Sequence, residues 1–188
     1  GMPDPVVTTS AARPLTVFDE DEQLFRDTVR RFARKEIGPR VRAMDEEAHF
    51  DPRLLSQCFD LGLMGIEIPE EYGGPGGTFT QSLVAIEELA AVDPSAAVIV
   101  DVQNTLVNNA ILRWGTEEQK RRWLPRLASD TTGAYALSEA GAGSDAFALA
   151  SRAEEVDGGF RITGRKLWIT NANEAGLFLV FANARPEA

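Results

Sequence analysis

The segment TEEQKRRWLPRLASDTTGAYALSEAGAGSD, residues 116–145, contains the change of pattern that decides the fold. Its first half begins with a helix signal, because Thr116 and Gln119 have the spacing of a capping box. Its second half has short β-prone runs and glycines, and helical periodicity stops there. We therefore place a boundary near residue 130, between a helical part and a part built from strands.

Upstream of this segment the hydrophobic pattern is helical. Asp19 with Glu22 has the spacing of a second capping box, and Asp51-Pro52 is a cap followed by proline at the first helical position. The glycine-rich run at 73–77 predicts an ordered loop, since a helix interior does not tolerate that density of glycine. The predicted helices cover 20–37, where Gly38-Pro39 ends the pattern, then 52–61, 80–92, 96–114 and 117–129.

Downstream of residue 130, Asp157-Gly158-Gly159 predicts a hairpin turn between the second and third of five short strands. The fold class is therefore α+β, with an all-helical domain at 15–130 and a partial β domain at 131–188, after a disordered lead at 1–14. Five strands leave an open sheet edge and an uncovered apolar face, which predicts a longer parent protein. The predicted strands are 133–137, 147–153, 159–163, 166–170 and 176–182.

Composition excludes several classes of function. The formal charge of −10 over 188 residues disfavours a nucleic-acid partner, and the densest basic stretch, 30–42, is typical of a solvated helix face. No apolar run approaches the ~20 residues of a membrane span. The single cysteine, Cys58, indicates a reducing compartment, and the single histidine, His49, is expected on a surface loop. No Cys/His cluster has metal-ligand spacing, so no metal is predicted.

Two motifs are candidates for ligand binding. In YALSEAGAGSD, 135–145, Gly141 and Gly143 allow backbone amides to converge and a ligand to approach the main chain, although an ordinary turn also explains them. In KLWIT, 166–170, Trp168 and Thr170 would share one face of a strand. That pair suits a planar heteroaromatic ligand, and it equally suits a core tryptophan beside a surface threonine.

Adjacent carboxylates at Glu87 and Glu88 invite an acid/base interpretation. Neighbouring residues on a helix point about 100° apart. A helix face and a cap partner therefore explain them better than a catalytic pair does.

Taken together, YALSEAGAGSD and ITGRKLWITNA resemble the paired flavin-contacting signature of the acyl-CoA dehydrogenase family, and GLMGIEIPEEYGG and GTEEQKRRWLPRLAS precede them in the family's order. The resemblance covers about 15–182 and implies the N-terminal domain and part of a β-barrel-like middle domain. The segments IEELAAVDPSAAV, VQNTL, LSEAGAGSDAFAL and AGLFLVFAN most resemble the short/branched-chain type, which acts on short straight and 2-methyl-branched acyl-CoA.

The resemblance implies FAD as the cofactor and assigns roles to individual positions. Ser138 keeps the hydroxyl where the family often has threonine, and Ala140 stands where it often has proline. Ser138 would face the flavin pyrimidine edge, Ser144 the pantetheine arm, and Thr170 the hydride-accepting N5. Gln103, Asn104 and Leu106 would lie near the floor of the acyl pocket, with buried, satisfied amides as the alternative. The implied flavin contacts are Tyr135, Ala136, Leu137, Ser138, Gly143, Ser144, Trp168, Ile169 and Thr170.

The activity implied is the oxidation of an acyl-CoA to a trans-2-enoyl-CoA. In the family a glutamate of a C-terminal helical domain removes the proton, so the base is expected beyond residue 188 and the fragment itself is expected to be inactive. Relatives pass electrons to an electron-transfer flavoprotein and form homotetramers. A bacterial chain of this kind would be cytoplasmic, and a eukaryotic one would lie in the mitochondrial matrix.

Two other classes of function remain open at this point. Flavin-dependent monooxygenases and oxidases share the fold and differ in the exposure of the reduced flavin to oxygen. A non-enzymatic helical binding module would fold as a monomer without flavin and bind a protein partner.

Overall fold

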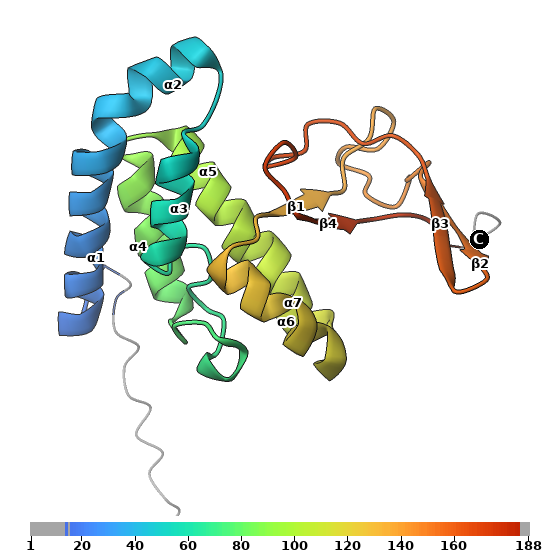
Figure 1. Ribbon diagram of the computed structural model, residues 1–188, viewed down its shortest axis with the longest axis horizontal. Coiled ribbons are helices and arrows are strands. Elements are labelled where there is room, and N and C mark those ends of the chain that lie inside the picture. The colour runs from blue at the N-terminus through green and yellow to red at the C-terminus, as the bar shows by residue number, and fades with distance from the viewer. Residues whose placement is uncertain (1–13, 15, 185–188) are drawn as a thin grey trace, which may run out of the picture.

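A computed structural model describes residue 14 and residues 16–184, and in this part of the chain the helices precede the strands (Figure 1). This order confirms the α+β class. Of the predicted lead at 1–14, all but Pro14 lies outside the described residues. The α-helices are α1 Glu20–Phe32, α2 Val41–Glu47, α3 Pro52–Asp60, α4 Phe79–Ala90, α5 Pro94–Asp101, α6 Asn109–Trp114 and α7 Glu117–Ser129.

The helix starts follow the capping signals in the sequence. The Asp19 side chain accepts from the Glu22 backbone amide at the start of α1, and Thr116 accepts from the Gln119 amide at the start of α7. Asp51 caps α3 with proline in the first turn. Because these caps satisfy backbone donors that would otherwise lack a partner, they fix where each helix begins.

The prediction that Gly38-Pro39 ends the first helix is wrong. The chain continues from α1 through a π-helical segment, Ala33–Ile37, and a 3-10 turn, Gly38–Arg40, into α2. Pro39 lies in the first turn of the 3-10 segment, at the point where the hydrogen-bonding pattern changes from that of the π-helical segment. The helical path ends instead at Ala48, which adopts a left-handed conformation with φ 50°.

The predicted helix at 96–114 is present as one path with a change of pitch in its middle. It runs as α5, a π-helical segment Val102–Asn108, and α6. Such wide turns re-aim side chains relative to a regular helix. The segment directs Gln103, Asn104 and Asn108 into the interior, where all three are buried.

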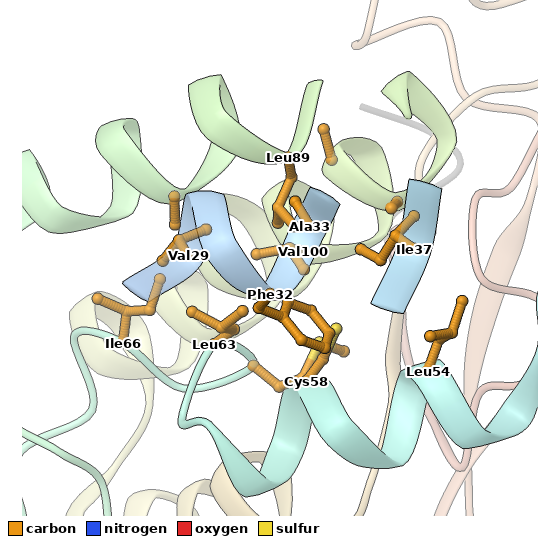
Figure 2. Packing of buried hydrophobic residues seen from close by; sticks show 14 residues of the cluster. Val29, Phe32, Ala33, Ile37, Leu54, Cys58, Leu63, Ile66, Leu89 and Val100 are labelled. Atoms are coloured by element: carbon orange, nitrogen blue, oxygen red, sulfur yellow. The ribbon is translucent and has the colours of Figure 1, made fainter. Parts of the chain in front are cut away.

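The main hydrophobic core lies between α1, α3, α4 and α5 (Figure 2). Phe32 and Cys58 meet at its centre, with Leu63 and Val100 beside them. Two ion pairs join α1 to α4: Glu88 of α4 accepts from the Arg26 and Arg30 side chains of α1 at 2.8 Å each. Apolar burial and a charged contact therefore both hold α1 against α4.

The strands form two small sheets rather than one. β1 Gly133–Ala136 pairs in parallel with β4 Leu177–Val180, and β2 Arg152–Val156 pairs antiparallel with β3 Gly159–Thr163. The hairpin turn at Asp157-Gly158 is confirmed, with Gly158 at φ 79°. Within the described residues these strands do not close into a barrel, so the structure holds only the start of a sheet domain.

Two strand predictions need correction. The segment predicted at 147–153 pairs only from Arg152 onward, because the loop before it is bonded to Glu139 through the Ala150 and Ser151 amides. The segment predicted at 166–170 is not a strand in the structure. Trp168 has φ 57°, which breaks an extended chain, and the β-propensity of this run is overridden by contacts described below.

The sheet region is fixed to the helices through β1. Gly133 N donates to Gln103 Oε1 at 2.7 Å, and a Cβ at Gly133 would lie 2.6 Å from a methyl group of Val107. Figure 1 shows β1 and β4 beside the helices, with the β2–β3 hairpin standing away from them.

Candidate functional site

The two candidate motifs, about thirty residues apart in the sequence, lie side by side in the fold. Leu167 N donates to Ser138 O at 2.9 Å, and Lys166 Nζ donates to Leu137 O at 3.0 Å. The end of β1 therefore runs beside the segment that leads to Trp168. The two motifs therefore lie on one surface. The strands predicted from the sequence did not indicate this neighbourhood.

A largely buried ion pair lies between the two segments that carry this surface. Lys166 Nζ lies 2.7 Å from Glu139 Oε1, and the two side chains are 12% and 5% exposed. The Lys166 ammonium, aided by the Ala150 and Ser151 amides, lowers the pKa of the Glu139 carboxyl to about 2. Glu139 is therefore ionised at neutral pH, and its position is fixed by several donors.

The glycine turn that follows Glu139 is open on its outer side. Glu139 and Ala142 exchange backbone hydrogen bonds of 3.2 Å, which close the turn. A Cβ built on Gly141 or Gly143 would meet no atom within 4 Å, and neither glycine has a positive φ. The described part of the chain therefore requires glycine at neither position, and the outer side of the turn is open.

Trp168 is exposed and directly follows Leu167, whose amide bonds to Ser138 just before the glycine turn. Its side chain is 94% exposed, so the interpretation of Trp168 as a core residue is wrong. The following turn is pinned by Asn171, which has φ 67° and whose Nδ2 donates to Gly133 O at 3.3 Å. Within the described residues the Trp168 ring is therefore accessible to another molecule, on a turn whose position is fixed.

The other residues assigned to flavin differ in access. Ser138, Gly143 and Ser144 are exposed, whereas Ala136 is buried. Tyr135 packs against Phe181 with ring centroids 4.8 Å apart. The half-buried members of the set are Tyr135, Leu137, Ile169 and Thr170.

Thr170 also lines a groove of about 970 Å³ between the 170–174 turn, α2 and the start of α5. His49 stands on the rim of this groove in an exposed loop, as expected from the sequence. The turn that carries Trp168 thus continues into a groove against the helical domain.

Gln103 and Asn104 are buried, and their amides bond within the chain. Gln103 Nε2 donates to the carbonyls of Leu127 and Thr131 at 3.0 Å each, and its Oε1 accepts from Gly133. Asn104 donates to Leu63 O and accepts from Ile66 N. The satisfied-amide alternative accounts for these contacts, and a substrate contact by either residue stays a prediction.

The remaining candidates have structural explanations. Arg30 and Arg26 lower the pKa of the Glu88 carboxyl to about 2, while Glu87 is exposed, so the two do not form a catalytic pair. Glu88 forms ion pairs with Arg26 and Arg30, so the interpretation of this glutamate pair as containing a cap partner is replaced by an ion-pair role for Glu88. Burial raises the pKa of the Cys58 thiol to about 12, which keeps it protonated.

Sequence reasoning missed Glu139, Lys166 and Asn171, the residues that hold the site together. The sequence did contain a signal, because Glu139 and Lys166, one acidic and one basic residue, lie inside the two motifs close to Ser138 and Trp168. Their pairing depends on the tertiary fold, and neither motif shows it alone. Across residues 14 and 16–184 there is no group of three potential metal ligands, and no helix of this part is long and apolar enough to cross a membrane.

The chain thus has a helical domain followed by two small sheets, with an open glycine turn and an exposed tryptophan on adjoining segments. Residues 19–131 match the family described as acyl-CoA dehydrogenase, N-terminal domain, and residues 134–188 match acyl-CoA dehydrogenase, middle domain. The chain therefore belongs to the acyl-CoA dehydrogenase family.

Several known proteins resemble this chain. A Dictyostelium discoideum protein named "Probable short/branched chain specific acyl-CoA dehydrogenase" is 51% identical over 94% of this chain and 43% of its own length. The mitochondrial short/branched chain specific acyl-CoA dehydrogenase of Bos taurus is 45% identical over 91% of this chain and 40% of its own. The chain thus spans about two fifths of the length of these relatives.

The structure is also similar to a solved structure described as a glutaryl-CoA dehydrogenase from Mycobacterium smegmatis in complex with FADH2. The TM-score is 0.82 at 35% identity, over 88% of this chain and 43% of that chain.

Proposed function

We propose that this chain supplies the flavin-contacting surface of an FAD-dependent acyl-CoA dehydrogenase. The observation that carries the proposal is that the exposed Trp168 and the open glycine turn at 139–144 lie on two segments joined by the hydrogen bond from Leu167 N to Ser138 O. A planar ring, adjacent hydroxyl groups and a turn without side chains fit a flat heteroaromatic group, so the residues present fit a flavin. The relative solved with FADH2 supports the same ligand class.

The residues of this surface divide into those that stack and those that donate hydrogen bonds. Trp168 would cover a ring face, while the Ser138 and Thr170 hydroxyls and the amides of the glycine turn would donate to polar edges. Bound FAD supplies a hydride acceptor for the acyl chain. Donors that are already fixed in place favour negative charge on the ligand without having to reorganise. Ser144, exposed at the end of the turn, would contact the thioester arm of the substrate.

The proton-abstracting base is proposed to lie outside residues 1–188. Glu139 is the buried carboxylate at this surface, and it is unsuited to the role, because Lys166 holds its pKa at about 2. The relatives have more than half of their length beyond the region that this chain spans, which leaves room for such a base.

The substrate is proposed to be a short or 2-methyl-branched acyl-CoA, on the strength of the two short/branched-chain relatives. Gln103 and Asn104 would then support the acyl pocket by fixing the π-helical segment on which they lie. On the basis of family membership we also propose that the electron acceptor is an electron-transfer flavoprotein and that the protein assembles as a homotetramer. The proposed location is the cytoplasm in a bacterium and the mitochondrial matrix in a eukaryote.

The proposal is tested by adding FAD to purified protein and following the emission of the flavin. Contact with an indole ring quenches flavin emission, so bound FAD should be dim. Trp168→Phe should weaken FAD binding about 3- to 10-fold, because one aromatic contact is lost, and should restore part of the emission. Trp114→Phe is the matched control, since Trp114 is 81% exposed but lies on α6. Equal behaviour of the two variants would contradict the assignment of Trp168.

A further inference from the structure

The ion pair between Lys166 and Glu139 joins three segments of the chain at the edge of the ligand surface. Lys166 Nζ bonds to Glu139 Oε1 at 2.7 Å and to Leu137 O at 3.0 Å. The Glu139 carboxylate also accepts from Ala150 N at 2.7 Å and from Ser151 N at 3.1 Å. One buried contact therefore ties the end of β1, the end of the 145–150 loop, and the segment leading to Trp168.

Both ligand-facing features begin at this pair. Glu139 opens the glycine turn and closes it through its backbone bonds with Ala142. Lys166 lies two residues before Trp168, and the residue between them, Leu167, donates to Ser138 O at 2.9 Å. If the pair separates, the turn and the tryptophan ring lose their common anchor.

The contribution of the pair is geometric rather than electrostatic. Its charges are opposite and in contact, so they largely cancel at the ligand surface. A single charge left in this buried place would be costly, which favours keeping the two groups together.

We propose that Lys166 and Glu139 are positioning residues that fix the glycine turn at 139–144 relative to Trp168, and that this spacing determines how tightly the flavin binds. The identity of the ligand rests on the proposed function. Neither residue acts as a catalytic group, because the pair lies beneath the surface and its polar atoms bond within the chain.

The test compares Lys166→Met with Lys35→Met, a matched lysine whose side chain is 79% exposed. Two quantities are measured: hydrogen exchange of the Leu167 amide, which needs no flavin, and the dissociation constant for FAD. For Lys166→Met we expect Leu167 exchange to accelerate about tenfold or more and FAD binding to weaken by about the same factor, because the common anchor is lost. Lys35→Met should change neither quantity.

The double variant Lys166→Met, Glu139→Gln separates positioning from the cost of a buried charge. It removes the unpaired carboxylate, so its melting temperature should return toward that of the wild type. The proposal expects Leu167 exchange to stay fast and FAD binding to stay weak in this variant. Recovery of both quantities would overturn it. If Lys166→Met alone does not fold, the double variant carries the test.

Different results would contradict the proposed flavin-binding function and the positioning role of the Lys166–Glu139 pair. Wild-type protein that binds no FAD contradicts the proposed function, while exchange at Leu167 still decides whether the pair positions the turn. Tight FAD binding by wild type together with unchanged Leu167 exchange in Lys166→Met overturns the positioning role and leaves the proposed function in place.

Discussion

At the scale of single residues, the space around a glycine distinguishes positions where the chain requires glycine from positions where it does not. Gly74 and Gly133 are required by the chain, since a Cβ at either would overlap Ile68 or Val107. Gly141 and Gly143 meet nothing and need no special backbone angle. Both glycines stand out in the sequence, but only the fold shows that neither packing nor backbone conformation within the described residues requires glycine there.

Gly143→Ala should therefore leave the fold intact and weaken FAD binding. The added methyl group projects into the space assigned to the ligand, and we expect a loss of about tenfold, the size of a modest steric displacement. The measurement is an FAD titration alongside thermal unfolding. Gly159→Ala is the control, because Gly159 is equally open but lies on the remote β2–β3 hairpin. Unchanged affinity in Gly143→Ala would show that no ligand approaches the turn.

At the scale of elements, the helix starts were predictable from the sequence, whereas the contacts that join the two motifs were not. Thr116 with Gln119 fixes the start of α7 by contacts within one turn, and local sequence contains that information. Lys166 instead bonds to Leu137 and Glu139, far away in the sequence, and those contacts overrode the β-propensity of Trp168 and its neighbours. The two motifs could be found from the sequence, whereas the pair that joins them required the fold.

The contact between α1 and α4 should make stability depend on pH through Glu88. Its pKa is about 2 in the folded chain against an ordinary 4.5, so unfolding takes up a proton between these values. The stabilisation is therefore complete above pH 4.5 and is lost as the pH falls toward 2. Glu88→Gln should lower the free energy of unfolding at neutral pH by about 2 kcal/mol, because charged hydrogen bonds to Arg26 and Arg30 are weakened.

Denaturant unfolding of Glu88→Gln and of wild type at several pH values measures this effect. The difference between the two proteins should shrink as the pH falls. Glu87→Gln is the control, because Glu87 is exposed on the same helix and should change little. A difference that does not depend on pH would rule out an ionised Glu88 as its origin.

The junction between β1 and the π-helical segment should be sensitive to added volume. Gly133→Ala places a methyl group 2.6 Å from Val107, which is fully buried, so something must shift. We expect a loss of about 1–3 kcal/mol in unfolding free energy, the usual cost of overpacking. Thermal unfolding beside Gly159→Ala checks this. Equal stability of the two variants would mean that β1 is not seated against the helix.

At the scale of the whole molecule, the chain combines a helical core with two small sheets that have exposed apolar residues. Phe178 and Val180 of β4 are 49% and 38% exposed, and Phe160 and Ile162 of β3 are more so. The chain also spans about two fifths of its relatives. Activity is thus expected only where the base and the remaining cover of the flavin are present.

Substrate choice is tested in protein of the length of the relatives. Loss of the visible flavin absorbance without oxygen should be faster with a short 2-methyl-branched acyl-CoA than with a 16-carbon straight chain. We expect kcat/KM to differ by about tenfold or more, since each misfitting methylene group lowers complementarity in an apolar pocket. Preference for the long chain would contradict the short/branched-chain assignment.

The flavin assignment is tested most directly by the visible absorption spectrum of the purified protein, recorded together with its intact mass so that flavin can be counted per chain. We expect flavin absorption bands corresponding to one FAD per chain, either retained on purification or restored by adding FAD. A protein that stays colourless, and takes up no FAD when it is supplied, would contradict the assignment of the glycine turn and Trp168 as a flavin surface.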